Sequence, residues 1–274
     1  MTDNIVQTPQ DFRNLFSLEG KVAIVTGGAG YTGSAISKGL ASFEANVVLV
    51  GRTESKLESF IKENNELYGN RFKAYACDIK YQNKFKEIVD LIDAKYGSVD
   101  ILVNNAYIKK KEKFDELSVE QWNAAIANNL TPYFTCSQAV IPSMKKKGNG
   151  SIINNASIYG FLGTDHRIFL DMGNNPAIHY AAIKGAITQM TRYLATLFAK
   201  EGIRVNTVSP GYFPRKKPGE FGRPDYIEQI CKRTPMGRTG NVEEIASTAV
   251  FLASNASSFI TGQNIVIDGG WSSW

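Results

Sequence analysis

Short apolar runs alternate along the chain with longer segments in which apolar residues recur every three to four positions. The short runs are apolar at consecutive positions, which is typical of strands buried on both faces of a parallel sheet. They occupy residues 22–25, 47–50, 72–77, 101–103, 152–153, 205–208 and 265–267. The longer segments predict helices near residues 31–44, 54–67, 81–96, 118–146, 178–201 and 241–253. This order predicts an α/β fold, a Rossmann-like, doubly wound parallel sheet of about seven strands with helices on both faces, in three layers.

Two segments break the rhythm, residues 161–177 and residues 212–240, and the second is rich in proline and glycine. Long irregular connections in a compact domain are usually functional, and ligands of such folds bind at the carboxyl edge of the sheet. We therefore expect both segments to be loops on the substrate side. Residues 1–19 form an N-terminal extension, and since no linker or repeat divides the chain, we predict a single domain over residues 1–274.

Composition narrows the function classes. The chain is 43% hydrophobic and 21% charged, and its net charge of +5 is spread without a basic tail, so nucleic acid is not an expected partner. Cys77, Cys136 and Cys231 lie far apart, which predicts neither a metal site nor a disulfide framework. The start lacks the order of a signal peptide, and no apolar run approaches ~20 residues. We expect no membrane span and a location in the reducing cytoplasm.

A glycine-rich stretch, residues 26–33, follows the first predicted strand and precedes the first helix. Glycine at Gly27, Gly30 and Gly33 allows a tight turn and lets backbone N–H groups approach a pyrophosphate at the helix N-terminus. The stretch therefore predicts a dinucleotide site, the alternative being an ordinary glycine-rich turn.

The end of the second strand bears on the choice of cofactor. NAD sites commonly place an acidic residue there, but this chain has Gly51 followed by Arg52. A guanidinium pairs well with a 2′-phosphate, so NADP(H) is favoured and NAD(H) remains the alternative. Arg52 could also be a solvated residue at the start of the next helix.

Polar residues follow the next two strands. Asp78, which precedes Ile79, could accept a hydrogen bond from the adenine amino group or merely cap a helix. Asn105 and Ala106 follow the fourth strand, where a short amide could line the ribose side.

Tyr180 and Lys184 are four residues apart in a predicted helix and therefore share one face. A nearby ammonium favours the phenolate of a tyrosine, which makes Tyr180 a candidate proton-transfer group. The spacing alone also arises by chance on exposed helix faces.

Together these pieces resemble the short-chain dehydrogenase/reductase family over nearly the whole chain. The resemblance rests on the order and spacing of short motifs, namely residues 20–27, 77–78, 104–106, 157, 180–184, 204–206, 209–211, 261–263 and 268–270.

The resemblance implies a catalytic tetrad. Tyr180 would be the acid/base, Lys184 would assist it, and both would contact the cofactor, Lys184 at the nicotinamide ribose. Ser157 would hydrogen-bond the substrate oxygen. Asn129 would hold a water of the proton relay, although the adjacent Asn128 could take that role. The same resemblance implies that Pro210 and Gly211, with the glycine turn and Tyr31, contact the cofactor.

Three features depart from the single-domain branch of the family. Tyr31 stands where its middle glycine is usual, which gives the glycine spacing of the extended branch, and Ser157 lies farther from Tyr180 than normal. Because the motifs at residues 104–106, 209–211 and 268–270 match the single-domain branch, residues 161–177 are interpreted as an insertion. Tyr107 also replaces a glycine, and with Tyr31 it is expected to narrow or reshape the cleft.

The implied activity is NAD(P)-dependent interconversion of a carbonyl and a secondary alcohol, with a sugar-derived or sugar-acid substrate expected first and a fatty-acyl β-keto substrate second. Basic loop residues could bind a substrate carboxylate or phosphate, or simply be solvated. They are His166, Arg167, Arg215, Lys216, Lys217 and Arg223.

Two other functions stay open. One is a nucleotide-sugar epimerase or dehydratase with tightly bound NAD, and the other is a dinucleotide-binding protein without turnover. The family also implies a homo-oligomer, a tetramer or a dimer, formed through helices 118–146 and 178–201 or through the C-terminal strand with Trp271 and Trp274.

Overall fold

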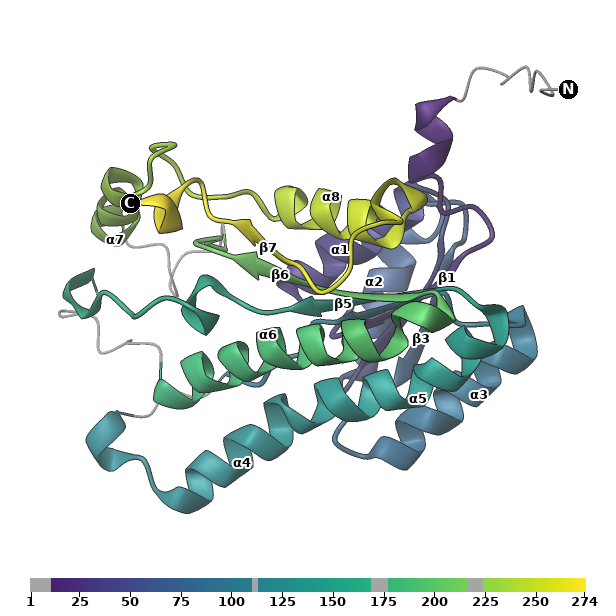
Figure 1. The fold of residues 1–274 in the computed structure, drawn as a ribbon, viewed down its shortest axis with the longest axis horizontal. Coiled ribbons are helices and arrows are strands. Elements are labelled where there is room, and N and C mark those ends of the chain that lie inside the picture. Colours follow the sequence, from purple (N-terminus) through teal and green to yellow (C-terminus); the bar gives the residue numbers. More distant parts are fainter. Residues whose placement is uncertain (1–10, 110–112, 169–176, 216–223) are drawn as a thin grey trace, which may run out of the picture.

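The structure, a computed structural model, describes residues 11–109, 113–168, 177–215 and 224–274. Its strands form one parallel sheet in the order β3-β2-β1-β4-β5-β6-β7 (Figure 1). The strands are β1 (Val22–Thr26), β2 (Asn46–Gly51), β3 (Phe72–Ala76), β4 (Ile101–Asn104), β5 (Gly150–Asn155), β6 (Ile203–Pro210) and β7 (Asn264–Ile267).

Helices cover both faces of this sheet. They are α1 (Tyr31–Ser42), α2 (Glu54–Asn64), α3 (Gln82–Tyr96), α4 (Val119–Asn129), α5 (Thr131–Lys147), α6 (Ile178–Phe198), α7 (Pro224–Arg233) and α8 (Val242–Ala253). Figure 1 shows α1 and α8 on one side and α3 to α6 on the other. The predicted three-layer, doubly wound α/β fold is confirmed.

Two hydrophobic cores explain why the strands are apolar at consecutive positions. Successive side chains of a strand point to opposite faces, so Ile24 and Val25 enter different cores. Val25 packs with residues of α1, α2 and α8, including Leu40, and Ile24 packs with residues of α3, α5 and α6, including Val140. Both faces of β1 are therefore buried, as its sequence predicts.

The segment predicted as one helix over residues 118–146 is two helices, α4 and α5. Pro132 lies in the first turn of α5 and has no backbone N–H to continue the bonds of α4. Tyr133 and Phe134 instead donate their N–H groups to the Leu130 carbonyl at 3.0 and 3.4 Å. The break lies directly after Asn129, the last residue of α4, and therefore determines the surroundings of its side chain and carbonyl.

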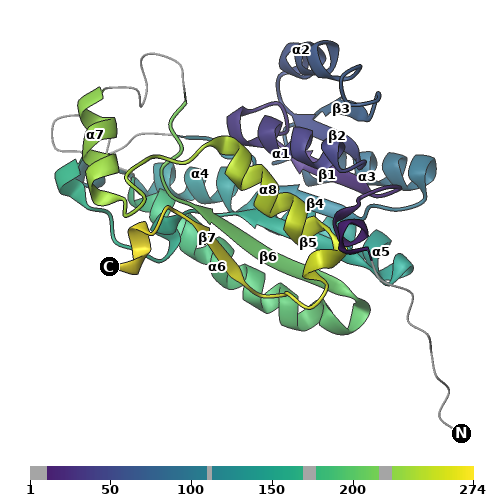
Figure 2. The same ribbon diagram turned by 90° about the horizontal axis from the view of Figure 1, so that it is seen from above.

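Residues 212–240 were predicted as an irregular loop, yet they contain α7. Tyr226 and Ile230, four residues apart on α7, are buried and pack with Ile168 of the 3₁₀ turn His166–Ile168. The flanking prolines and glycines hid this amphipathic spacing. Figure 2 shows α7 beyond one end of the sheet, near the C-terminus.

Strand order reverses between β1 and β4, where the chain turns from β3 back to the other half of the sheet. In open parallel sheets this reversal leaves a crevice at the carboxyl ends of the strands. Of the helices that the structure describes, none is both long and apolar enough to cross a membrane.

Candidate active site

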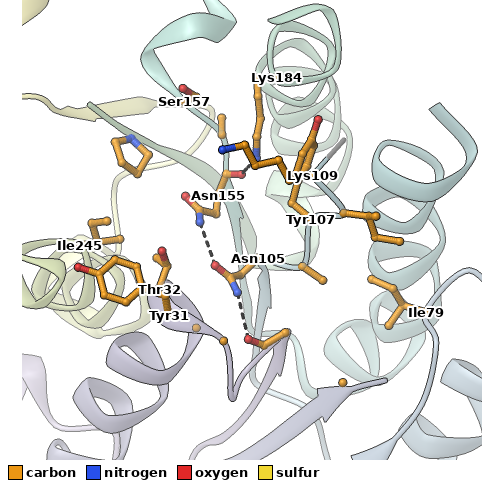
Figure 3. A pocket seen from close by; sticks show the side chains of 18 of the residues that line it. Tyr31, Thr32, Ile79, Asn105, Tyr107, Lys109, Asn155, Ser157, Lys184 and Ile245 are labelled. Carbon is orange, nitrogen blue, oxygen red and sulfur yellow. Dashed lines mark hydrogen bonds between the residues drawn. The ribbon is translucent and has the colours of Figure 1, made fainter. Parts of the chain in front are cut away.

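A cavity of about 450 Å³ opens at this crevice (Figure 3). Of the residues proposed from the sequence, it is lined by Gly27, Gly30, Tyr31, Gly33, Arg52, Asp78, Ile79, Asn105, Ala106, Ser157, Tyr180, Lys184, Pro210 and Gly211. Asn129 is not among the lining residues, whereas Asn128 is. Segments far apart in the sequence thus meet at one edge of the sheet, as predicted.

The glycine turn forms one end of the cavity. Gly27 has φ +65°, and a Cβ at Gly33 would overlap the Gly27 carbonyl oxygen. Gly30 caps α1 without a side-chain hydrogen bond, so the first N–H groups of the helix stay available to an anion. This backbone cradle fits a pyrophosphate, and a side chain at Gly33 would force the turn that forms it to shift.

Tyr31 is fixed by contacts to the segment that follows β6. Its hydroxyl donates to the Pro214 carbonyl at 2.8 Å, and the Arg215 guanidinium lies 5.5 Å from its ring centroid. Burial raises the pKa of the Tyr31 phenol, which keeps it a donor. Tyr31 therefore reshapes the wall of the cavity by tying the start of α1 to that segment.

Arg52 and Asp78, which come soon after the ends of β2 and β3, also line the cavity. Arg52 is exposed, and within the described part of the chain it forms no ion pair, so its guanidinium can meet a phosphate. Asp78 accepts the Lys80 N–H at 3.1 Å, and its other carboxylate oxygen lies 3.5 Å from the Lys80 ammonium. This end combines open backbone N–H groups with exposed positive charge.

A row of amides joins the glycine turn to the other end of the cavity. Asn105 Nδ2 donates to the Thr26 carbonyl at 3.0 Å, and Asn155 Nδ2 donates to Asn105 Oδ1 at 2.9 Å. The Asn155 carbonyl in turn accepts the Lys184 ammonium at 2.6 Å. Sequence reasoning missed Asn155, although it lies two residues before Ser157.

Ser157, Tyr180 and Lys184 meet at that other end. Ser157 follows β5, and Tyr180 and Lys184 come from the first turns of α6. Burial raises the pKa of the Tyr180 phenol, and a hydrogen bond with Ser157 partly offsets this effect. Burial also lowers the pKa of the Lys184 ammonium to about 7. Burial is the largest influence on the pKa of the Tyr180 phenol in this structure, and the expected effect of the Lys184 ammonium on that phenol stays a prediction.

Three tyrosine rings surround the Lys184 ammonium. Its nitrogen lies 5.1 Å from the Tyr107 ring centroid and 5.7 Å from those of Tyr133 and Tyr180. Tyr107 also packs edge-on against Tyr180, with centroids 5.2 Å apart and planes at 86°. Tyr107 therefore narrows this end of the cavity, and its ring supports both polar side chains.

Asn129 is buried at the break between α4 and α5. Its Oδ1 accepts the Ile108 N–H at 2.6 Å, so its amide anchors the segment that follows β4. Its own carbonyl does not receive the Tyr133 N–H, which is bonded to Leu130. Asn128 bonds its own helix through the Ala124 carbonyl at 2.6 Å.

The predicted basic residues of the substrate side are separated. Arg215 lines the cavity, whereas Arg167 is 80% exposed and paired with Asp165 at 2.8 Å. His166 lies in the same 3₁₀ turn as Arg167 and does not line the cavity. Lys216, Lys217 and Arg223 lie outside the described residues.

Aromatic residues pack together on the expected substrate side, beyond Ser157 and Tyr180. The hydroxyls of Tyr159 and Tyr212 share a hydrogen bond, and Tyr212 packs against Trp271 with centroids 4.8 Å apart. Within the described ranges, no group of three or more His, Cys, Asp or Glu side chains could hold a metal ion.

The chain is similar to known proteins over most of its length. A family model described as enoyl-(acyl carrier protein) reductase matches residues 32–272. The chain is 36% identical over 259 residues to gluconate 5-dehydrogenase of Gluconobacter oxydans, covering 94% of this chain and 96% of that protein. It is 37% identical over 256 residues to a 3-oxoacyl-(acyl-carrier-protein) reductase of Thermotoga maritima, covering 92% and 98%.

The chain is also similar to a solved structure of such a dehydrogenase. The crystal structure of a gluconate 5-dehydrogenase from Burkholderia cenocepacia in complex with NADP and tartrate matches with a TM-score of 0.85. It is 32% identical, and the match covers 95% of this chain and 98% of that chain.

Proposed function

The chain belongs to the short-chain dehydrogenase/reductase family, and on that premise we propose that it interconverts a carbonyl and a secondary alcohol with NADP(H). One observation carries the proposal: Ser157, Tyr180 and Lys184 meet in the cavity that also contains the glycine turn. When bound, the nicotinamide would supply or accept the hydride.

The residues present fit such a cofactor. The backbone cradle at Gly27 and Gly33 suits a pyrophosphate, and Arg52 suits a 2′-phosphate. NADP(H) is therefore favoured over NAD(H), and the relative solved with NADP supports that order. The remaining cofactor contacts would come from Gly30, Tyr31, Asp78, Ile79, Asn105, Ala106, Pro210 and Gly211.

The polar side chains divide the proton chemistry among them. Ser157 and Tyr180 would both hydrogen-bond the substrate oxygen, and Tyr180 would give or take the proton at its phenol oxygen. Lys184, held by the Asn155 carbonyl, would stabilise negative charge on that phenol. The Asn129 carbonyl, which lies at the helix break, would hold the water that exchanges protons with solvent.

Sugar acids are the substrate class we favour. Two relatives are named as gluconate 5-dehydrogenases, and Arg215, which lines the cavity, could pair with a substrate carboxylate. A 3-oxoacyl thioester is the second candidate, since the Thermotoga maritima reductase is similar to an equal degree.

Cofactor titration followed by substrate assay tests the proposal. We expect tighter binding of NADPH than of NADH, with the preference lost in Arg52→Asp, and NADPH-dependent reduction of keto sugar acids. Reduction of 3-oxoacyl thioesters instead would favour the second candidate. Release of tightly bound NAD, with turnover independent of added cofactor, would favour an epimerase. Binding without turnover on either substrate panel would favour a non-catalytic protein.

We also propose that the chain acts as a single domain and as a homo-oligomer, a tetramer or dimer, in the reducing cytoplasm. Phe134 of α5 and Tyr193 and Leu197 of α6 are large apolar side chains exposed to solvent, which suits a contact between copies. Cys77, Cys136 and Cys231 are free thiols, which suits a reducing compartment. Light scattering of the purified protein would measure the assembly.

A further inference from the structure

The orientation of the Asn155 side-chain amide is fixed by the Thr26 carbonyl, to which it is linked by two successive hydrogen bonds through Asn105. Thr26 presents a carbonyl, which can only accept, so Asn105 must direct its Nδ2 at it, at 3.0 Å. Asn105 then presents Oδ1 to its other neighbour, and Asn155 must meet that oxygen with Nδ2, at 2.9 Å. The side-chain oxygen of Asn155 consequently faces away from Asn105.

That oxygen is buried and accepts no hydrogen bond from the residues that the structure describes. A buried acceptor without a donor costs free energy comparable to a lost hydrogen bond, so such atoms are rare. The Asn104 Oδ1 also has no donor among the described residues, but Asn104 does not line the cavity. Asn155 does line the cavity.

The position of Asn155 indicates which ligand would satisfy it. Figure 3 shows Asn155 between Asn105, beside the glycine turn, and the end that holds Ser157 and Lys184. Its own carbonyl accepts the Lys184 ammonium, so Asn155 is in direct contact with the tyrosine–lysine end of the cavity. An acceptor there can bond only an N–H or O–H group of a ligand.

We propose that Asn155 Oδ1 accepts a hydrogen bond from the nicotinamide half of the bound dinucleotide, either from a ribose hydroxyl or from the carboxamide N–H. This inference rests on the proposed function. When the dinucleotide binds, Asn155 Oδ1 gains the donor that the described residues do not supply. Its Nδ2 keeps the hydrogen bond to Asn105 and so holds the Asn105 side chain in place. Asn155 thus contributes to the affinity for the whole dinucleotide but not to the affinity for its adenosine half.

Equilibrium binding to two variants, without any turnover, tests this role. Asn155→Leu removes both the oxygen and the donor to Asn105 at similar volume, and Asn155→Asp keeps an acceptor oxygen but loses that donor. Each is titrated calorimetrically with NADPH and with 2′,5′-ADP, which contains the adenosine half alone. Retained binding of 2′,5′-ADP shows that each variant is folded and that its glycine turn is intact.

We expect Asn155→Leu to weaken NADPH binding roughly tenfold while 2′,5′-ADP binding stays within twofold. Asn155→Asp should weaken NADPH less than Asn155→Leu does, relative to 2′,5′-ADP. Equal losses for both ligands in Asn155→Leu would overturn the proposal, because the residue would then act only through Asn105. Unchanged NADPH binding would overturn it as well, since a bond to this oxygen would then add nothing to the affinity for the dinucleotide.

A third ligand identifies the donor. The nicotinic-acid analogue of NADP replaces the carboxamide N–H groups by a carboxylate. If the unaltered protein binds the analogue more weakly than it binds oxidised NADP, by the same factor that Asn155→Leu loses for NADP, the carboxamide is the donor. If Asn155→Leu weakens binding of the analogue and of NADP by the same factor, the ribose hydroxyl is the donor. If the unaltered protein binds 2′,5′-ADP but no dinucleotide, the inference fails, and if it binds none of the ligands, the proposed function fails with it.

Discussion

The two ends of the cavity are built in different ways. The glycine-turn end, formed by Gly27, Gly33 and Arg52, offers backbone N–H groups and an exposed charge. The tyrosine–lysine end is formed by Ser157 and Lys184, which are buried, and by Tyr180, which is half-buried, and three tyrosine rings surround the Lys184 ammonium. The first end needs space and positive potential, while the second needs side chains held at defined positions in a low-dielectric environment. Substitutions should therefore affect binding at one end and chemistry at the other.

Tyr180→Phe is the sharpest test of the tyrosine–lysine end. It removes the phenol oxygen but keeps the ring, so we expect turnover to fall about 1,000-fold while NADPH binding changes little. Steady-state kinetics and calorimetric titration measure the two quantities. Tyr193→Phe, on the exposed side of the same helix, is the matched control and should leave turnover unchanged. Turnover that survives in Tyr180→Phe would rule out the assigned acid/base.

Gly33→Ala is the corresponding test of the glycine-turn end. Its Cβ would overlap the Gly27 carbonyl and lie 2.7 Å from the Asn105 amide nitrogen, so the turn must shift. We expect roughly 100-fold weaker NADPH binding, because crowding a packed turn typically costs about 1–3 kcal/mol. Gly163→Ala is the control, since a Cβ there meets nothing within 4 Å. If both variants bind NADPH like the unaltered protein, the cradle does not hold the cofactor.

The tyrosine–lysine end should also carry a stability cost that depends on pH. Burial lowers the pKa of Lys184 to about 7, whereas an unfolded lysine titrates near ~10.4. The unfolded state therefore binds more protons between these values, and stability rises with pH across that window. The cost is complete below about pH 7 and disappears near pH 10.

Lys184→Met removes this buried charge. We expect the variant to be more stable than the unaltered protein by roughly 2–3 kcal/mol at pH 6, with the difference vanishing toward pH 10. Urea unfolding at several pH values measures it, and Lys146→Met, at an exposed position, should show no such trend. A difference independent of pH would mean that packing, and not the charge, is responsible.

The same contrast explains what the sequence could predict. Strand positions, the glycine turn and the Tyr180–Lys184 spacing are local patterns, and all were found. Asn155 was missed because its role depends on Asn105, 50 residues away. The α4–α5 break was missed because the apolar spacing continues through Pro132, whose missing N–H favours a helix start over a helix interior. The helix α7 was missed because its buried face meets residues 158–168 only in the folded chain.

Substitution of Tyr107, which narrows the cavity beside Lys184, should have the smallest effect on activity. Its ring is one of three near the ammonium, so Tyr107→Leu should lower kcat/KM for alcohol oxidation about fivefold. Without this ring the ammonium is less stabilised, so a smaller fraction of Lys184 is charged and the Tyr180 phenolate loses support. The rise of kcat/KM that accompanies ionisation of Tyr180 should therefore move to higher pH. Tyr107→Phe keeps the ring and should retain both the rate and the pH profile. If Phe and Leu give the same profile, the ring does not act on Lys184, and Tyr107 only fills space at this end.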